Sequence, residues 1–582
     1  MSRHAARRHG RGLVMAALIC AAALTGAVAL PAASPAPTAA ASIADAAMDG
    51  NTEAVRALLK QGADVNSAQG DGLTALHWAA KKGDAAMASM LIYGGANVRA
   101  ATRLGGYTPL HLAAEIGSAP VIAALIKGGA DVNVLTTTGT TPLMLAAAAG
   151  DTGSLAALLD AGADANALET GRGHTALMFA AAADRVEAVK LLLARGADPK
   201  LATKTVDLAG LSRAGLDPDG RNLAGNPNGR SGGNNRSAAP AKERVPGVDR
   251  QFLLNELVYA QGGMTPLLFA ARQGHADVVA ALLDGGVNVN QLKEGDRTCP
   301  LLIATINGQF DTGRLLLEHG ADPDLASENG VTPLYAVVNV QWAPKALYPQ
   351  PRAYLNQQIG YLDFMKLLLE KGANPNVRLR KKVWYSGYNF DQSGVDEIGA
   401  TPFWRAAYAG DVEAMKLLVA HGADPNIPTV KPAARPVIGD ADTRAVKDVS
   451  GLTPVPLGGP SVTPLQAAAG VGFGEGFAGN SHRHAPEGTL AAVKYLVEEL
   501  HADVNARDHE GNTALHHAAA RGDNEMILYL VDHGADVKAV NREGRTTVDM
   551  ANGPVQRVQP FPDTIALLEK LGAVNNHKCV SC

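Results

Sequence analysis

The chain has 582 residues, with 52 basic and 56 acidic side chains and a formal net charge of −4. Hydrophobic residues make up 47% of it and aromatic residues only 4%, so we expect a folded protein whose core is built from Leu and Ala. Four cysteines in so long a chain exclude a disulfide scaffold. The slightly acidic balance argues against nucleic acid as a partner and against a polybasic membrane patch.

Residues 1–41 have the pattern of a secretory signal peptide. Four arginines precede an uncharged run from Leu13 to Leu30, and small residues lead to a predicted cut before Ser42. Cleavage there leaves 48 basic and 56 acidic groups, a net charge of −8. The run of 18 residues is long enough that an uncleaved anchor stays an alternative. The signal and the Ala- and Gly-rich composition suggest a bacterium, so we expect a periplasmic or secreted protein.

From residue 43 onward, one short phrase recurs. It reads Thr-(Pro/Ala)-Leu-x-x-Ala, with Cys299 once in the Thr position, and each copy is followed by Gly-Ala-Asp-x-Asn or a close variant. The copies at Thr74, Thr108 and Thr141 start 34 and 33 residues apart. A period near 33 residues predicts stacked repeats, and it favours binding over chemistry as the function.

Each phrase predicts the same local structure. Thr is a good N-cap, and Pro or Ala at the next position starts a helix whose Leu and Ala share one face. A glycine often follows nine residues after the Thr, as Gly83 does after Thr74, and is suited to a left-handed C-cap. Paired aliphatic residues such as Leu91 and Ile92 then predict a second helix. Each unit is therefore helix, tight turn, helix and an extended segment, which we call a finger.

The chain resembles the ankyrin repeat family, whose signature stands at Thr108-Pro109-Leu110-His111. The resemblance covers most of residues 43–576 and implies an all-α solenoid of about twelve repeats with short β-type turns in the fingers. The first and last units are atypical, as the ends of a stacked array require. The family implies a structural role for His77, His111 and His516. It also implies that a protein partner binds the concave face, formed by the finger tips and first helices.

Long segments interrupt the period and divide the chain. We place repeats 1–5 at 42–200, repeats 6–8 at 263–376, repeat 9 at 401–426, and repeats 10–12 at 463–576. Between them we predict a largely disordered insertion at 201–262 that ends in a short amphipathic helix, an aromatic finger loop at 377–400 and a Pro-rich loop at 427–462. Further insertions fall near Trp342–Tyr354 and, rich in Gly, at 471–488. A tail at 577–582 follows.

Aromatic residues gather in one region, where 13 of the chain's 26 lie between residues 335 and 408. Trp, Tyr and Arg dominate the energetics of protein interfaces, so this region is a candidate for partner binding. The alternative is that the rings pin the inserted loops to the array. Together with varied finger-tip residues, the candidate binding residues are Arg103, Tyr107, Arg297, Arg378, Arg380, Trp384, Tyr385, Tyr388, Phe390 and Trp404.

Other apparent chemical motifs leave several interpretations open. Cys579 and Cys582 form a terminal Cys-x-x-Cys, which could be a disulfide, an idle tail, a truncated c-type haem motif or a metal site. Cys299 is interpreted as a small buried residue. His482 and His484 lie in one loop with acidic neighbours and could hold a metal, but a solvated loop is the simpler interpretation.

The prediction is a non-enzymatic scaffold for protein–protein interaction, exported and monomeric, that uses no cofactor or metal and has no membrane span after signal cleavage. The first alternative is an electron-transfer accessory protein whose terminal cysteines carry haem. The second is an enzyme whose active site is built from the loop insertions.

Overall fold

The computed structural model describes residues 42–213, 258, 260–342, 352–383, 395–433, 448–473, 484–486, 488–553 and 559–578. The chain divides into two units, Met1–Ser42 and Ile43–Cys582, and all elements below belong to the second. Within the described residues this unit is a succession of twelve helix pairs with one two-stranded sheet. The fold is the all-α repeat solenoid that the sequence predicts.

The first helices of the twelve pairs share the Thr phrase or its remnant. They are α1 (Ile43–Met48), α3 (Ala75–Lys82), α5 (Pro109–Glu115), α7 (Pro142–Ala149), α9 (Ala176–Ala182), α13 (Pro266–Gln273), α15 (Pro300–Ile306), α17 (Pro333–Gln341), α19 (Pro402–Tyr408), α21 (Pro464–Ala468), α23 (Ala514–Arg521) and α25 (Thr547–Ala551).

The second helices carry the paired aliphatic residues. They are α2 (Thr52–Lys60), α4 (Ala85–Tyr93), α6 (Ala119–Lys127), α8 (Thr152–Asp160), α10 (Val186–Ala194), α14 (Ala276–Asp284), α16 (Phe310–Glu318), α18 (Tyr361–Glu370), α20 (Val412–Ala420), α22 (Gly488–Lys494), α24 (Asn524–Asp532) and α26 (Pro562–Lys570). A π-helical turn, η3 (Tyr495–Glu499), extends α22, and a short 3-10 helix, η2 (Ala353–Asn356), precedes α18.

The predicted caps are confirmed. All eleven Thr or Cys residues that open a phrase are N-caps with extended backbone. At Thr141 the hydroxyl accepts the Met144 N–H at 3.3 Å, which satisfies a donor that the helix itself cannot pair. Gly83 ends α3 with φ of 72°, a left-handed conformation that favours glycine.

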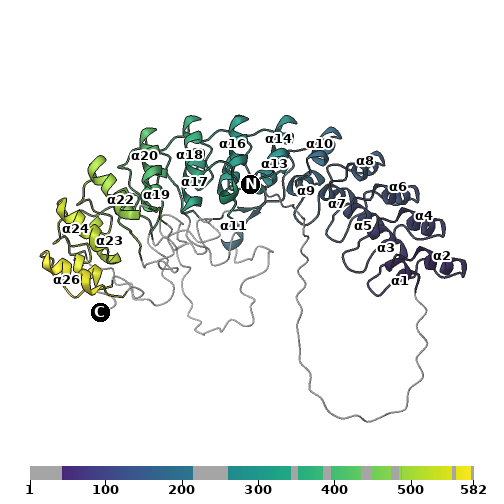
Figure 1. Cartoon of the computed structure of the whole chain (residues 1–582), viewed down its shortest axis with the longest axis horizontal. Coiled ribbons are helices and arrows are strands. Elements are labelled where there is room, and N and C mark those ends of the chain that lie inside the picture. The colour runs from purple at the N-terminus through teal and green to yellow at the C-terminus, as the bar shows by residue number, and fades with distance from the viewer. Residues whose placement is uncertain are drawn as a thin grey trace, which may run out of the picture. The chain divides into compact units, whose positions relative to one another are not determined.

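The helices lie in two rows, as Figure 1 shows. Each first helix packs on the first helix of the next repeat, and second helices from α4 to α20 do the same. The core lies between the rows as one continuous cluster of buried residues from Ile43 to Ala573, with Leu76, Leu110 and Leu143 almost fully enclosed. Each repeat therefore buries its apolar face against its neighbours, as a stacked array requires.

The array continues directly across the insertion between repeats 5 and 6, because α9 packs on α13 and α10 on α14. The Thr203 N–H donates to the Met264 carbonyl at 3.0 Å, and the Gly263 N–H donates back to Thr203 at 3.0 Å. Strand β1 (Val206–Asp207) pairs antiparallel with β2 (Ala260–Gln261), and α11 (Leu208–Arg213) follows β1. The sequence did not predict this pairing.

Some sequence predictions cannot be compared with the fold. Of the insertion predicted at 201–262, residues 214–257 and 259 lie outside the described residues, and so does most of the amphipathic helix expected at its end. Its two ends, 201–213 and 260–262, are described and form β1, α11 and β2. The N-terminal segment 1–41 also lies outside the described residues. Among the described helices, none is long and apolar enough to cross a membrane.

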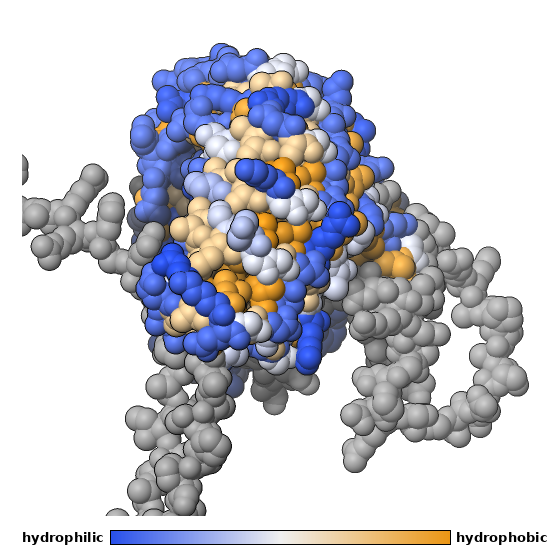
Figure 2. All heavy atoms as spheres, turned by 90° about the vertical axis from the view of Figure 1, so that its right-hand side faces the viewer, coloured by the Kyte–Doolittle hydropathy of each residue, from blue (hydrophilic) through white to orange (hydrophobic). Residues whose placement is uncertain are grey.

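The end of the array at repeat 1 has an apolar face. Figure 2 looks at this end, and apolar side chains gather along its middle while charged ones lie along its edges. In the described chain no repeat precedes α1 and α2, and Met48 on α1 is 39% exposed. The atypical first unit therefore keeps a partly apolar outer surface.

Candidate protein-binding face

One position of the repeat builds a row of large apolar side chains along the first helices. It falls four residues after each capping Thr or Cys, next to the positions that face the core. In repeats 2–7 its side chains are half-buried or just covered, with Leu112 8% and Ile303 9% exposed. We call this row the inner stripe. Its members are Trp78, Leu112, Leu145, Phe179, Phe269 and Ile303.

Polar residues of the fingers hold the rings of the inner stripe. The Trp78 indole N–H donates to Gln69 Oε1 at 2.8 Å. The His174 ring lies with its centroid 5.8 Å from those of both Phe179 and Phe269. Glu169 lies 3.3 Å from His174 Nδ1 and so helps to place it. The stripe is therefore a preorganised surface rather than a set of loose side chains.

Glu169 is itself fixed by the backbone of its finger. Its carboxylate accepts the Gly171 N–H at 2.8 Å and the Arg172 N–H at 2.7 Å. Burial opposes the charge on Glu169, but these N–H groups and His174 outweigh it, so its pKa lies below the ordinary value. The finger between repeats 4 and 5 thus keeps an ionised carboxylate beside the aromatic part of the stripe.

Histidines in the capping phrase tie each first helix to a finger. His77 Nδ1 accepts the Thr74 N–H at 3.1 Å, and its Nε2 lies 3.1 Å from the Tyr107 carbonyl in the next finger. His111 makes the same pair of contacts, with Thr108 and with the Thr140 carbonyl. The structural role that the family resemblance implies for these two residues is confirmed.

The inner stripe changes character at repeat 9, where Arg405 occupies the same position. Arg405 is only 3% exposed, its Nε donates to Asn339 Oδ1 at 2.8 Å, and its Nη2 donates to the Trp342 carbonyl at 3.1 Å. The guanidinium also lies 5.7 Å from the centre of the Tyr408 ring. The row of large apolar side chains thus stops after repeat 7, because repeat 8 has the small, buried Ala336 at this position and repeat 9 has a buried cation.

Trp404 lies inside the array rather than on its surface. Its side chain is fully buried, its indole N–H donates to the Val462 carbonyl at 3.0 Å, and its ring stacks on Tyr408 with a centroid separation of 5.3 Å. Trp342 is buried as well and donates to Asp411 Oδ2 at 2.7 Å. For these two rings the alternative interpretation holds, since they pack on the array, and we leave Trp404 out of the binding face.

The other predicted binding residues fall into three groups. Arg103 and half-buried Tyr107 share the finger between repeats 2 and 3, and Arg297 is exposed between repeats 6 and 7. Arg378 and Arg380 are exposed together between repeats 8 and 9. The third group lies outside the described residues: Trp384, Tyr385, Tyr388 and Phe390, as well as the terminal pair Cys579 and Cys582.

Cys299 is buried, as the sequence predicts. Its Sγ accepts the Leu302 N–H at 3.3 Å in place of a Thr hydroxyl, and burial raises the pKa of the thiol to about 11. It is therefore a structural cap with little thiolate at neutral pH.

A serine and a histidine meet near repeats 10 and 11 without forming a catalytic relay. Ser461 Oγ lies 2.6 Å from His509 Nδ1, but Ser461 is only 3% exposed. The neighbouring carboxylate, Asp508, contacts His517 Nε2 at 3.1 Å instead of orienting His509. Among the described residues no group of three or more His, Cys, Asp or Glu could hold a metal. His484 is described, whereas His482 and the two acidic neighbours lie outside that part of the chain.

Family models match most of the repeats described above. The model for ankyrin repeats (3 copies) matches residues 43–136, 110–203 and 247–341. The model for ankyrin repeats (many copies) matches 495–551, and the single ankyrin repeat model matches 398–430. The chain belongs to the ankyrin repeat family.

Curated relatives share short stretches of ankyrin repeats with this chain. Ankyrin repeat protein nuc-2 of Neurospora crassa is 31% identical over 167 residues, which is 28% of this chain and 15% of that protein. The 2-5A-dependent ribonuclease of Homo sapiens is 43% identical over 67 residues, which is 12% of this chain and 9% of that protein. An ankyrin repeat protein of Rickettsia felis is 28% identical over 153 residues, which is 26% of this chain and 39% of that protein. The match thus spans well under half of each of these relatives.

Sequence reasoning proposed the concave face as the binding face but missed the inner stripe. It named first helices and finger tips, and it chose individual residues mainly in the fingers and in the aromatic insertion. The signal was available, because the fourth residue after the cap is large and apolar in six consecutive ankyrin repeats. Comparing one position across all repeats would have found it.

Proposed function

We propose that this ankyrin repeat protein is a non-enzymatic scaffold that holds a protein partner against the inner stripe and the finger tips beside it. The inner stripe is the observation that carries the proposal. Trp and Phe contribute large contact areas, and rings already held by Gln69 and His174 lose little entropy when a partner covers them. Three of the six members are aromatic, and partly exposed aromatic side chains are enriched at the centres of interfaces.

Export to the bacterial periplasm or the cell exterior is part of the proposal. Its support is the sequence from Arg3 to Ser42, in which a basic start, an apolar run and small residues follow one another. The full chain should appear in the periplasmic or culture fraction of a bacterial host, whereas a chain that starts at Ser42 should stay in the cytoplasm. Equal distribution of both chains would remove export from the proposal.

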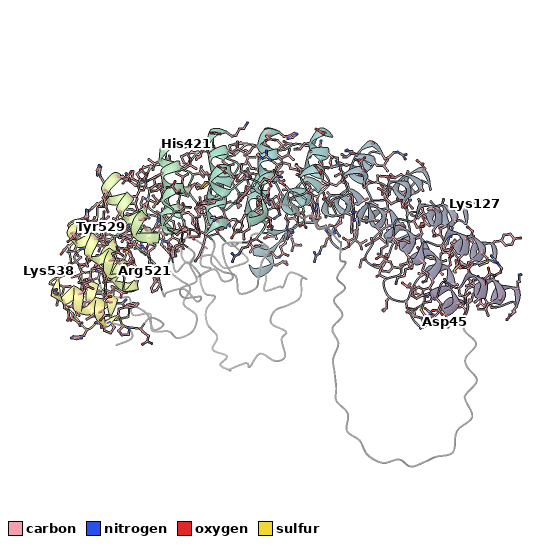
Figure 3. The ribbon with its side chains drawn as sticks, in the orientation of Figure 1. Asp45, Lys127, His421, Arg521, Tyr529 and Lys538 are labelled. Carbon is pink, nitrogen blue, oxygen red and sulfur yellow. The ribbon has the colours of Figure 1, made fainter. Side chains whose placement is uncertain are left out.

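Site-specific photocrosslinking in the cell tests the binding face. A photoreactive amino acid is placed at Phe179 or Phe269 on the inner stripe, and in parallel at Lys127 or His421. Figure 3 labels these two residues on the side of the second helices. We expect one discrete protein adduct from the inner positions and none from the outer ones. Adducts of the same partner from the outer positions alone would contradict the proposal.

Loss of aromatic rings from the inner stripe can be compared with loss of a ring elsewhere on the array. Trp78→Ala with Phe179→Ala should lower partner affinity by more than about tenfold, since central aromatic side chains contribute most to binding. Tyr93→Ala also removes an aromatic ring, but Tyr93 is 97% exposed at the end of α4, so partner affinity should not change. Circular dichroism establishes that each variant is folded. Full affinity in the folded double variant would rule out the stripe.

A further inference from the structure

The finger between repeats 8 and 9 has an unusual concentration of positive charge. Four cations stand within five residues, Arg378, Arg380, Lys381 and Lys382, and we call this segment the cationic finger. Side chains alternate along its start, because Leu379 is buried at 3% exposure while Arg378 and Arg380 are exposed. Val383 closes the segment at 1% exposure. Two apolar anchors therefore turn the arginines outward.

Backbone hydrogen bonds to both sides hold the cationic finger in place. The Arg380 N–H donates to the Asn329 carbonyl of the preceding finger at 2.9 Å, and Leu379 exchanges hydrogen bonds with Ala400 and Gly399 at 3.0 and 2.8 Å. The Arg378 side chain donates to the Gly399 carbonyl at 2.9 Å and to the Pro428 carbonyl of the following finger at 2.6 Å. The charge is thus presented by a rigid support, which lowers the entropy lost on binding.

The described carboxylates near the cationic finger do not pair with its two arginines. Glu328 Oε1 lies 4.0 Å from Lys381 Nζ, and Asp396 accepts the Ile398 N–H at 3.0 Å within the same finger. Glu397 is buried, and burial raises its pKa although the charges of Arg405 and Lys382 act in the opposite direction. Arg378 donates to carbonyl oxygens, and in the described part of the chain no carboxylate pairs with either arginine.

A further cation, Lys431, lies in the next finger. Lys431 Nζ donates to the Val455 carbonyl at 2.7 Å, so this cation too is held by a neutral group. The four cations of the cationic finger lie close together in a chain whose net charge is −4. The sign of this short cluster is opposite to that of the chain as a whole.

We infer that the cationic finger docks an acidic segment of the protein partner, a stretch in which Asp or Glu side chains meet Arg378 and Arg380. This inference rests on the proposed function and adds the chemistry of the partner to it. Guanidinium groups bind carboxylates through paired hydrogen bonds, and among the described residues no carboxylate occupies Arg380. A phosphate backbone fits less well, because it needs a long track of cations and is repelled by the acidic chain.

Binding of a short fluorescent polyglutamate peptide to the full mature chain tests the inference at low ionic strength. A peptide of alternating Gly and Ser and an oligothymidylate of equal length are the comparison probes. We expect the glutamate peptide alone to bind, and its affinity to fall as NaCl is added, because salt screens exposed charges. No binding of the glutamate peptide, or tighter binding of the oligothymidylate, would overturn the inference.

Charge-reversal variants locate the peptide on the surface. Arg380→Glu should weaken peptide binding by about tenfold, whereas Lys127→Glu makes the same charge change on α6 and should leave the affinity within about twofold. Arg380→Lys keeps the charge but loses the paired hydrogen-bond geometry, so its peptide affinity should lie between those of Arg380→Glu and Lys127→Glu. Equal losses in Arg380→Glu and Lys127→Glu would mean a general electrostatic attraction and would also overturn the inference.

The two proposals can fail separately. If the inner stripe crosslinks a partner but the glutamate peptide does not bind, only the inference about the cationic finger is wrong. If the peptide binds at Arg380 while the inner stripe yields no adduct, the acidic docking site remains and the stripe is not the binding face.

Discussion

Single residues show how one structural need is met by different side chains. In several repeats the residue three positions after the cap accepts the backbone N–H of the capping Thr. His77, Gln466 and Asp549 all do so, with donor–acceptor distances of 3.1, 2.7 and 2.9 Å. The sequence suggested a histidine at this position, but a glutamine or an aspartate makes the same contact. In repeats 6 and 7 the position holds Leu268 and Leu302, which offer no acceptor, and the caps form without one.

The histidine in repeat 11 makes protein stability depend on pH. Burial, with a further contribution from the charge of His517, lowers the pKa of His516 to about 4 from the ordinary 6.5. The unfolded chain therefore binds the proton more tightly between these two values. His516 contributes stability fully above pH 6.5 and loses it as the pH falls through that window toward 4. The lowered pKa values of His77 and His111 act in the same direction.

Urea unfolding at pH 7 and pH 5 measures this effect, and His516→Gln isolates it. Glutamine already makes the same capping contact at Gln466, so the variant should keep the helix cap. We expect the wild-type chain to be less stable at pH 5 than at pH 7, and the variant to lose less stability between these two pH values. The contribution of His516 to this loss should approach ~3 kcal/mol as the pH falls to 4. A variant with an unchanged pH dependence would remove His516 as a source.

At the scale of elements, repetition was predictable and its exceptions were not. The Thr phrase predicted every cap because capping depends on neighbours within three or four residues. The burial of Trp404 depends on the Val462 carbonyl, and the β1–β2 pair joins residues more than fifty positions apart. Contacts across inserted segments leave no periodic signal, so neither they nor the π-helical turn η3 could be predicted.

The β1–β2 pair predicts that the insertion it closes can be removed. Asp207 and Ala260 are directly opposed in the antiparallel pair, so an Asn-Gly turn should join them in place of residues 208–259. Because α9 and α13 already pack together, the array should remain folded and lose no more than about 2 kcal/mol, mainly from the loss of buried Leu208. Circular dichroism and urea unfolding of the shortened chain measure this, and loss of helix content would contradict it.

Gly262 explains why the ends of this insertion meet so closely. Its φ is 92°, and a Cβ there would collide with the Lys204 carbonyl oxygen. Only glycine combines this backbone conformation with so short an approach. The junction between repeats 5 and 6 therefore depends on a glycine, and the next residue, Gly263, also has a positive φ of 66°.

At the scale of the whole molecule, stability is distributed along a line. Repeats pack on their sequence neighbours, so the loss of core volume in one repeat should be felt first beside it. Leu282→Ala in α14 removes a fully buried side chain and should cost about 2–5 kcal/mol. Hydrogen exchange should then rise in α10, α14 and α16 before it rises in α24. A uniform rise in all twelve repeats would show that the chain unfolds as one cooperative block.

The fingers differ from one another along the array, and these differences can fix the position of a bound partner. One position, two residues after the finger Asn, holds the exposed Leu135 and Leu168 near the start and Arg378 and Arg507 further on. Arg378 and Arg507 each donate to the carbonyl at the same position of the following finger. These hydrogen bonds fix the arginine side chains, so the polar fingers stay distinct from the fingers with exposed leucines. An array of identical repeats would offer the same site about every 33 residues, and a partner could shift by one repeat at no cost. Because the fingers are unlike, each register of the partner on the array has a different binding free energy. One alignment and one direction of the partner are therefore selected.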